Sequence, residues 1–116
     1  TSVIEIKIPE SIEEISEKAF NGCRLIEKII IPKSVSKIGK CAFYGCYHLK
    51  NIHIPPSVNI IEDEAFYDCN SLVSVKIESP QISIGNSAFK KCPSLKEIDV
   101  PDKFLSTSEK ERIFGK

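Results

Sequence analysis

Residues 26–46 read IEKIIIPKSVSKIGKCAFYGC, and residues 49–69 read LKNIHIPPSVNIIEDEAFYDC, which is almost the same line. An Ala-Phe pair marks each copy, and a cysteine follows three positions after each phenylalanine. The pair recurs with a constant period of twenty-three positions, as Ala19-Phe20, Ala42-Phe43, Ala65-Phe66 and Ala88-Phe89. A constant period of this length, without insertions, is the sequence signature of a solenoid, in which copies of one unit stack in a row.

Several apolar columns keep the same period. They are Val3, Ile26, Leu49, Leu72 and Leu95; Ile6, Ile29, Ile52, Val75 and Ile98; Ile8, Ile31, Ile54, Ile77 and Val100; and Ile15, Ile38, Ile61 and Ile84. One unit cannot bury its own apolar face, whereas stacked units bury a continuous core. Each column is therefore predicted to be a ladder of buried side chains that runs through the stack.

Every unit predicts the same order of elements. A short strand ends at a proline, a turn and a second extended piece follow, and a helix of one to two turns ends near the cysteine. Ile38, Ala42 and Cys46 are spaced by four residues, which favours one face of a helix. In the fourth unit Gln81 takes a place that is apolar elsewhere, and Ile82 follows it, so we expect a local shift there.

The short pattern L-x-x-I-x-I-P resembles a leucine-rich repeat. The longer line, with Ile31-Pro32, Ser34-Val35, Ile38-Gly39, Ala42-Phe43 and Cys46, resembles the BspA-like subclass of these repeats. The resemblance implies a curved, right-handed α/β repeat solenoid of about four and a half units, with short strands on the inner face and short helical turns opposite. It also implies protein binding at the surface of a cell, in adhesion to host, matrix or other cell-surface proteins.

The two ends of the chain are expected to differ. Units begin near Val3, Ile26, Leu49, Leu72 and Leu95, which gives a solenoid over residues 1–104. Residues 105–116 are predicted to form a helical cap that folds Ile113 and Phe114 over the last unit. Either Ser106 with Glu109 or Ser108 with Glu111 would make its capping box. The first strand has no cap, so either the sequence is cut from a longer array or this edge pairs with another copy or a preceding domain.

Composition excludes several classes of function. Sixteen basic and sixteen acidic residues cancel, which leaves no electrostatic footprint for nucleic acid or an anionic membrane. No apolar run is long enough to cross a bilayer, and a sequence without methionine says nothing about a signal peptide. No nucleophile elbow, phosphate loop or dinucleotide fingerprint is present. We therefore expect neither enzymatic activity nor a cofactor.

The cysteines follow the repeat. Cys23, Cys46, Cys69 and Cys92 share one column beside Ala-Phe, which predicts buried, reduced thiols. Cys41 falls in a column with Lys18, Glu64 and Ser87, so we expect it to be exposed. Zinc binding is not expected from Cys46, His48 and His53, because no CxxC pair or HxxxH motif accompanies them.

The residues that alternate with the buried positions of each strand are predicted to face outward on the inner surface of the coil. This candidate face consists of Glu5, Lys7, Lys28, Ile30, Asn51, His53, Ser74, Lys76, Glu97 and Asp99. A protein ligand is the expected partner. A second surface could arise from Tyr44 and Tyr67, which either stack on each other between units or form a contact patch.

Three functions remain open at this point. The first is a surface-exposed or secreted protein-binding module that binds through the candidate face. The second is a structural spacer that displays a neighbouring domain and binds nothing itself. The third is an intracellular interaction scaffold, which reduced cysteines would allow. No feature of the sequence identifies a ligand.

Overall fold

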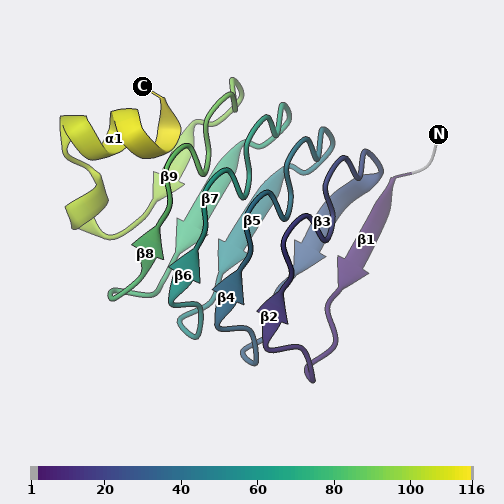
Figure 1. Cartoon of the computed structure of the whole chain (residues 1–116). Helices are drawn as coiled ribbons and strands as arrows, with labels where there is room; N and C mark the ends of the chain where they lie inside the picture. Colours follow the sequence, from purple (N-terminus) through teal and green to yellow (C-terminus); the bar gives the residue numbers. More distant parts are fainter. Residues whose placement is uncertain (1–2, 116) are drawn as a thin grey trace.

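The computed structural model describes residues 3–115 and is a β-solenoid in which each turn of the coil adds one strand to each of two parallel sheets (Figure 1). The larger sheet contains, in spatial order, β1 (Ile4–Lys7), β3 (Ile26–Ile30), β5 (Asn51–Ile54), β7 (Ser74–Ile77) and β9 (Glu97–Asp99). The smaller sheet contains β2 (Glu14–Ile15), β4 (Lys37–Ile38), β6 (Ile60–Ile61) and β8 (Ser83–Ile84). The predicted repeat solenoid is confirmed.

The register of the strands equals the period of the sequence, apart from one irregularity at the start of β1 and β3, where Ile4 pairs with Ile26. Ile52 pairs with Val75 and Ile54 with Ile77, in each case one period further along the chain. The apolar columns therefore form ladders between the two sheets, and Ile52, Val75 and Ile54 are at most 2% exposed. Val3 is not buried as predicted: it is 38% exposed, because within residues 3–115 no unit packs on the other side of the first one. The phenylalanine column is continuous as well, with ring centroids 5.2, 5.0 and 4.9 Å apart along Phe20, Phe43, Phe66 and Phe89.

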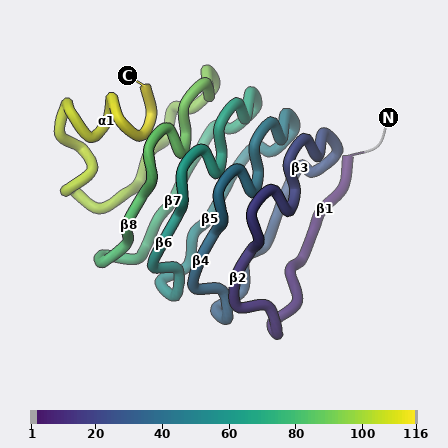
Figure 2. The backbone as a smooth tube through the Cα atoms, viewed as in Figure 1, coloured from purple at the N-terminus to yellow at the C-terminus, as the bar shows by residue number. Residues whose placement is uncertain are grey.

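The segments that join β2 to β3, β4 to β5 and β6 to β7 are not helical, contrary to the expectation from the spacing of Ile38, Ala42 and Cys46. They are runs of tight turns (Figure 2). In the second unit φ is +56° at Cys41 and +71° at Gly45. An α-helix needs consecutive residues in the right-handed region, so a left-handed residue at every fourth position interrupts it.

The backbone N–H groups of these turns form two kinds of hydrogen bond, one within the turn and one to the next unit. The N–H groups of Ala42, Tyr44 and Cys46 donate to carbonyls three residues earlier, within the same turn. The N–H groups between them, on Cys41, Phe43 and Gly45, donate to the next unit, at N···O distances of 3.2, 2.7 and 2.8 Å. A helix would use all of these donors internally. The turns therefore add a third ladder of hydrogen bonds to those of the two sheets.

The cysteine column lies in the core, and no disulfide joins any of the five cysteines. Cys46, Cys69 and Cys92 are at most 4% exposed, and each thiol donates to the carbonyl of a phenylalanine in the preceding unit at 3.3 Å. The prediction of buried thiols is confirmed for these three, while Cys23 in the first unit is half-buried. Cys41 is not exposed as predicted: it is 7% exposed, and its Sγ lies 3.8 Å from Glu64 Oε1 in the next unit.

The fourth unit shows the expected shift. Gln81 is exposed, and Ile82 takes the buried place at 2% exposure. Ser79, two residues before Gln81, is 2% exposed and is the one buried polar residue within residues 3–115.

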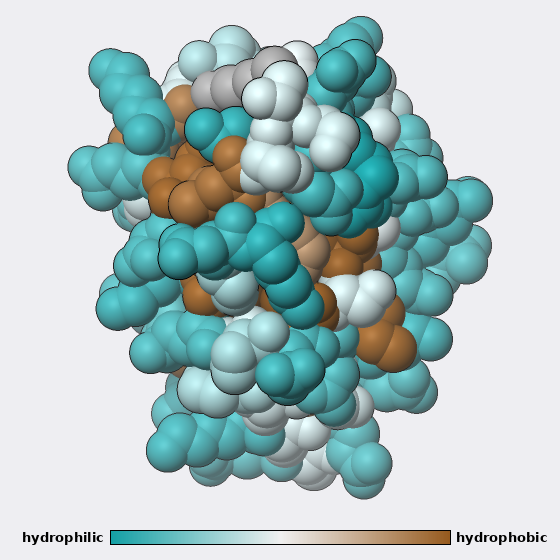
Figure 3. Space-filling view, turned by 90° about the vertical axis from the view of Figure 1, so that its left-hand side faces the viewer, coloured by the Kyte–Doolittle hydropathy of each residue, from teal (hydrophilic) through white to brown (hydrophobic). Residues whose placement is uncertain are grey.

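The C-terminal segment packs on the last unit. After a 3-10 helix, η1 (Asp102–Phe104), comes the helix α1 (Thr107–Phe114). The Ser106 side chain caps α1 by accepting from Glu109 N–H, while the Glu109 carboxylate pairs with Arg112. The ring of Phe114 extends the aromatic column, 5.5 Å from Phe89. Figure 3 looks onto this end, where hydrophilic side chains cover most of the surface and apolar ones show between them.

Candidate binding face of the larger sheet

The outward surface of the larger sheet carries all ten residues of the candidate face. Side chains in β5 alternate strictly, with Asn51 and His53 exposed and Ile52 and Ile54 buried. Glu5, Lys28, Asn51, Ser74 and Glu97 form one row of paired neighbours across the five strands. The second row consists of Lys7, Ile30, His53, Lys76 and Asp99, of which Ile30 is apolar and 38% exposed.

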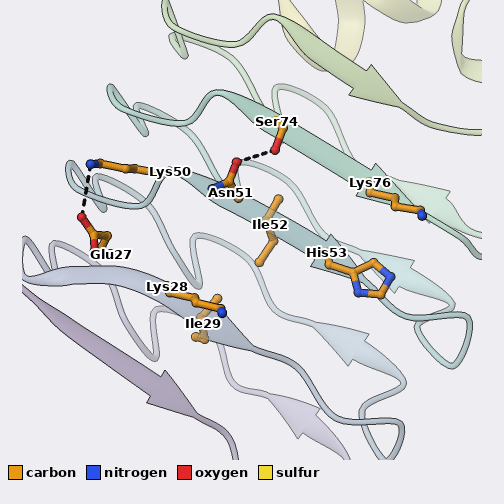
Figure 4. A pocket seen from close by; sticks show the side chains of 9 residues that line it. All are labelled: Glu27, Lys28, Ile29, Lys50, Asn51, Ile52, His53, Ser74 and Lys76. Carbon is orange, nitrogen blue, oxygen red and sulfur yellow. Dashed lines mark hydrogen bonds and ion pairs between the residues drawn. The ribbon is translucent and has the colours of Figure 1, made fainter.

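The middle of this face is hollowed into a shallow depression of about 430 Å³ (Figure 4). Lys28 comes from β3, Asn51 and His53 from β5, and Ser74 and Lys76 from β7. The complete lining is Glu27, Lys28, Ile29, Lys50, Asn51, Ile52, His53, Ser74 and Lys76. Three lysines and a histidine therefore surround the depression, with an amide and a hydroxyl between them.

Some of these groups are already paired with each other. Lys50 Nζ lies 3.2 Å from Glu27 Oε2, and Ser74 Oγ lies 2.5 Å from Asn51 Oδ1, as the dashed lines of Figure 4 show. Each contact joins residues of two neighbouring units of the coil. Because both charges of the Lys50–Glu27 pair stay partly exposed to water, the pair contributes little to stability.

His53 is paired with an acid from the next turn of the coil. Its Nε2 contacts Glu78 Oε2, just beyond the end of β7. The hydrogen bond from His53, followed by the charges of His53 and Lys76, lowers the pKa of the Glu78 carboxyl below its usual range. Lys28 and Lys76, in contrast, make no ion pair within residues 3–115, so they are the cations at the centre that an incoming group can meet.

Glu27, Lys50 and Glu78 lie outside the set that strand alternation predicts. Glu27 is the extra residue of an irregularity in β3, because Ile4 pairs with Ile26 and Glu5 with Lys28, and the alternation of the strand does not reach it. A signal for one pair is present in the sequence, since Glu27 and Lys50 carry opposite charges one period apart and residues one period apart are neighbours in a stacked array.

Tyr44 and Tyr67 stack on each other across two units. Their ring centroids are 4.9 Å apart with an interplanar angle of 12°, and both side chains are half-buried. The charged group of Lys91 lies 5.9 Å from the centre of the Tyr67 ring. Of the two alternatives for these tyrosines, packing between units is the one confirmed.

Residues 3–115 contain neither a cluster of metal-ligating side chains nor a membrane-spanning helix. No group of three or more His, Cys, Asp or Glu side chains in this range could hold a metal ion. None of the helices formed by these residues has the length and apolar character that a membrane-spanning helix needs.

A coil of short repeated turns, with parallel strands, an aromatic ladder and corners made of tight turns, defines a leucine-rich repeat type of solenoid. The family model described as "BspA type Leucine rich repeat region (6 copies)" matches residues 1–114. The chain therefore belongs to the BspA-type leucine-rich repeat family.

Solved structures agree with this assignment. A leucine-rich repeat protein from Bacteroides ovatus is 30% identical, with a TM-score of 0.74 over 90% of this chain. The T. pallidum leucine-rich repeat protein TpLRR is 25% identical, with a TM-score of 0.58 over 93% of this chain. The chain spans 29% of the length of the first protein and 66% of the second. None of the curated proteins matches it.

Proposed function

We propose that this chain is a non-catalytic protein-binding module and that its ligand is a protein that contacts the candidate face. One observation carries the proposal: ten outward side chains from five adjacent strands form one continuous surface, and its middle is hollowed by about 430 Å³. Five strands extend this surface for about 19 Å along the coil. A continuous surface of this kind, held on a rigid sheet, suits recognition of another protein.

The side chains on the candidate face indicate which groups a complementary partner surface would carry. Lys28 and Lys76 flank the depression, while Asn51 and Ser74 offer an amide and a hydroxyl between them. Ile30 adds exposed apolar area on the neighbouring strand. A partner surface with carboxylates opposite the two lysines and an apolar side chain opposite Ile30 would complement this arrangement.

Family membership supports a place at the cell surface or in a secreted protein, where the module would contact host, matrix or other cell-surface proteins. An adhesive role of this kind is part of the proposal. Because the chain spans 29% of the Bacteroides ovatus protein and 66% of TpLRR, the activity of any longer protein that contains it is likewise proposed.

The test is a binding measurement against a panel of extracellular matrix and plasma proteins at physiological salt. The disabling variant carries Ile30→Glu and His53→Glu, which place two negative charges on the candidate face. The matched control carries Ile60→Glu and Ser83→Glu on the outward side of the smaller sheet, where Ile60 is 41% exposed. Circular dichroism checks that both variants fold.

Saturable binding that the first variant loses and the control keeps would support the proposal. Binding that both variants keep would place the contact elsewhere on the molecule. If no panel member binds, the module acts as a spacer or binds a partner of another compartment, and localisation of the full-length protein in its own cell separates these two outcomes.

A further inference from the structure

A second depression adjoins the first one on the outward surface of the larger sheet. It has a volume of about 420 Å³ and lies between β7 and β9, where its lining is Ser74, Val75, Lys76, Glu97, Ile98 and Asp99. Ser74 and Lys76 line both depressions, so β7 is their common border. Together the two depressions form one shallow groove, which crosses the strands from β3 to β9 along the axis of the coil.

The two parts of this groove carry opposite charge. Between β3 and β7, the cations without an ion pair within residues 3–115 are Lys28 and Lys76, whereas the acids beside them are held in ion pairs. At β9, Glu97 and Asp99 are exposed and make no ion pair within the same residues. Lys96, next to Glu97, does not line the groove. The groove is therefore dipolar, basic from β3 to β7 and acidic at β9.

The opposite charges of Lys76 and Asp99 do not close the groove. The two residues are paired neighbours on β7 and β9, but no ion pair joins them within residues 3–115. An ion pair between two exposed side chains of this kind contributes little free energy in water. Both groups are therefore available to a ligand.

The sheet also fixes the spacing of the charges. The midpoint between Lys28 on β3 and Lys76 on β7 lies over β5 (Figure 4), and β5 is two strands away from β9. Neighbouring strands are about 4.8 Å apart, so the basic and the acidic centre are separated by about 10 Å. An extended chain that lies along the groove covers this distance in about three residues.

We propose that the partner of the candidate face inserts a dipolar segment into this groove, an extended stretch with acidic side chains over β5 and basic side chains over β9. The carboxylates meet Lys28 and Lys76, and the cations meet Glu97 and Asp99. Charge selects this occupant, because a purely acidic segment meets like charge at β9 and a purely basic one meets like charge between β3 and β7. The inference rests on the proposed function, whose ligand it specifies.

The test uses the pentapeptide Asp-Asp-Gly-Lys-Lys, acetylated and amidated at its ends, as the probe. Neighbouring side chains of an extended chain point to opposite sides, so one member of each charged pair faces the sheet. Changes in the backbone amide signals of the isotope-labelled chain, measured by NMR at millimolar peptide, are expected in β5, β7 and β9. Asp-Asp-Gly-Asp-Asp and Lys-Lys-Gly-Lys-Lys are the control peptides, and each is expected to bind about fivefold more weakly.

Two charge reversals distinguish a dipolar partner from an acidic one. Lys76→Glu and Asp99→Lys change the charge in opposite directions, yet each is expected to weaken binding of Asp-Asp-Gly-Lys-Lys about fivefold, because each removes one of the two attractions. An acidic ligand would instead bind more tightly to Asp99→Lys. The matched controls Lys40→Glu and Glu17→Lys make the same charge changes at exposed positions just beyond β4 and β2 and leave binding unchanged. Circular dichroism verifies that every variant is folded.

Three results would overturn the dipolar groove. They are an acidic peptide that binds as tightly as the dipolar one, binding that Asp99→Lys leaves unchanged or strengthens, and the absence of any signal change in β5, β7 and β9 at millimolar peptide. None of them decides the proposed function, which depends on the panel of whole proteins. A panel protein that binds through the candidate face while the dipolar peptide does not would keep the proposed function and refute the dipolar groove.

Discussion

At the scale of single residues, the phenylalanine column is a continuous stack of rings in the core. Phe43, Phe66 and Phe89 are fully buried, and their rings are nearly parallel, with interplanar angles of 7° and 1° between neighbours. Each ring thus packs against an identical ring above and below. The two outermost members depend on different neighbours, since Phe89 contacts Phe114 while Phe20 is half-buried at the open end.

Replacement of Phe43 by alanine is expected to lower the free energy of unfolding by about 3–5 kcal/mol. The ring is lost from the middle of the column, and the neighbours Phe20 and Phe66 cannot close a gap that the two sheets hold open. Urea unfolding followed by circular dichroism measures the loss. Ile30→Ala on the exposed face is the control, with an effect of about 0.5 kcal/mol or less. A loss below about 1 kcal/mol for Phe43→Ala would contradict a core role for the column.

Because its thiols are buried, the protein is expected to become less stable towards unfolding at alkaline pH. Burial, followed by the charge of Cys23, raises the pKa of the Cys46 thiol to about 12, compared with about 8.5 in an unfolded chain. The neutral thiol is thus favoured in the folded state. Its contribution is complete below about pH 8.5 and is lost as the pH rises towards about 12.

Above about pH 8.5 the free energy of unfolding should therefore fall by about 1.4 kcal/mol per pH unit for this one thiol. Cys46→Ala removes the titrating group, so its unfolding free energy should fall less steeply than that of the wild type over the same range. Lysines and tyrosines titrate there too, which is why the difference between the two proteins is the measured quantity. If the unfolding free energies of the wild type and Cys46→Ala fell equally with pH, the Cys46 thiol would have the same pKa in the folded and unfolded states, which contradicts the prediction.

At the scale of the elements, the start of each turn segment decides how closely two units approach. A Cβ atom on Gly85 would lie 2.5 Å from the backbone nitrogen of Asp63 in the preceding unit. Gly85→Ala is therefore expected to push the units apart and to cost about 1–3 kcal/mol. Glu62→Ala, in the same column one unit earlier, loses only a partly exposed ion pair with Lys37 and should cost about 1 kcal/mol or less.

Both effects can be measured by chemical unfolding of the two single variants. The losses of Gly85→Ala and Glu62→Ala can be compared directly, because the two positions are one period apart and both receive alanine. Equal losses for the two variants would mean that the units separate without cost at Gly85.

The constant period is sufficient to predict the solenoid, the ladders and the exposed rows of the larger sheet. In a stacked array, residues that are one period apart in the sequence are neighbours in space. It does not distinguish a helix from a run of turns. Ile38, Ala42 and Cys46 are buried in either structure, and the deciding feature is the left-handed backbone at Cys41 and Gly45. Cysteine gives no sequence signal for that conformation, although glycine does.

The same limit explains why Cys41 was predicted wrongly and why the partner of His53 was not predicted at all. Lys18 and Ser87 in its column predict an exposed Cys41, yet it is buried in the second unit beside Glu64 of the third. The period does not predict the partner of His53 either, because Glu78 lies 25 residues away and not one period. The period predicts contacts within one column. Contacts between neighbouring columns also depend on the directions of the side chains, which the period does not predict.

At the scale of the whole molecule, the C-terminal end of the coil is closed by α1, which continues the hydrogen bonding of the repeat units. The carbonyls of Arg112 and Ile113, at the end of α1, accept from the N–H groups of Ser87 and Phe89. The helix thus uses carbonyls that its own backbone leaves free to continue the ladder of the turns. Arg112 also donates to the carbonyl of Ile84, at 2.7 Å.

Removal of residues 105–116 is expected to destabilise the solenoid by about 3–6 kcal/mol, because Ile113 and Phe114 are both buried against the last unit and each contributes about 1.5–3 kcal/mol. Ser106→Ala, which removes only the cap of α1, should cost about 0.5–2 kcal/mol. Unfolding in urea gives both values, and light scattering reports whether the shortened chain associates. A truncated chain as stable as the intact one would show that residues 105–116 do not act as a cap.

The direction of the hydrogen bonds has a mechanical consequence. Every ladder runs along the axis of the coil, and the two termini lie at opposite ends of it (Figures 1 and 2). A force that pulls the termini apart therefore loads the units one after another, as in a zipper, and not all at once. Each repeat unit that detaches would release roughly 70–80 Å of chain. Stretched between two anchors, the molecule should lengthen in equal steps and yield gradually, and single-molecule pulling would resolve those steps.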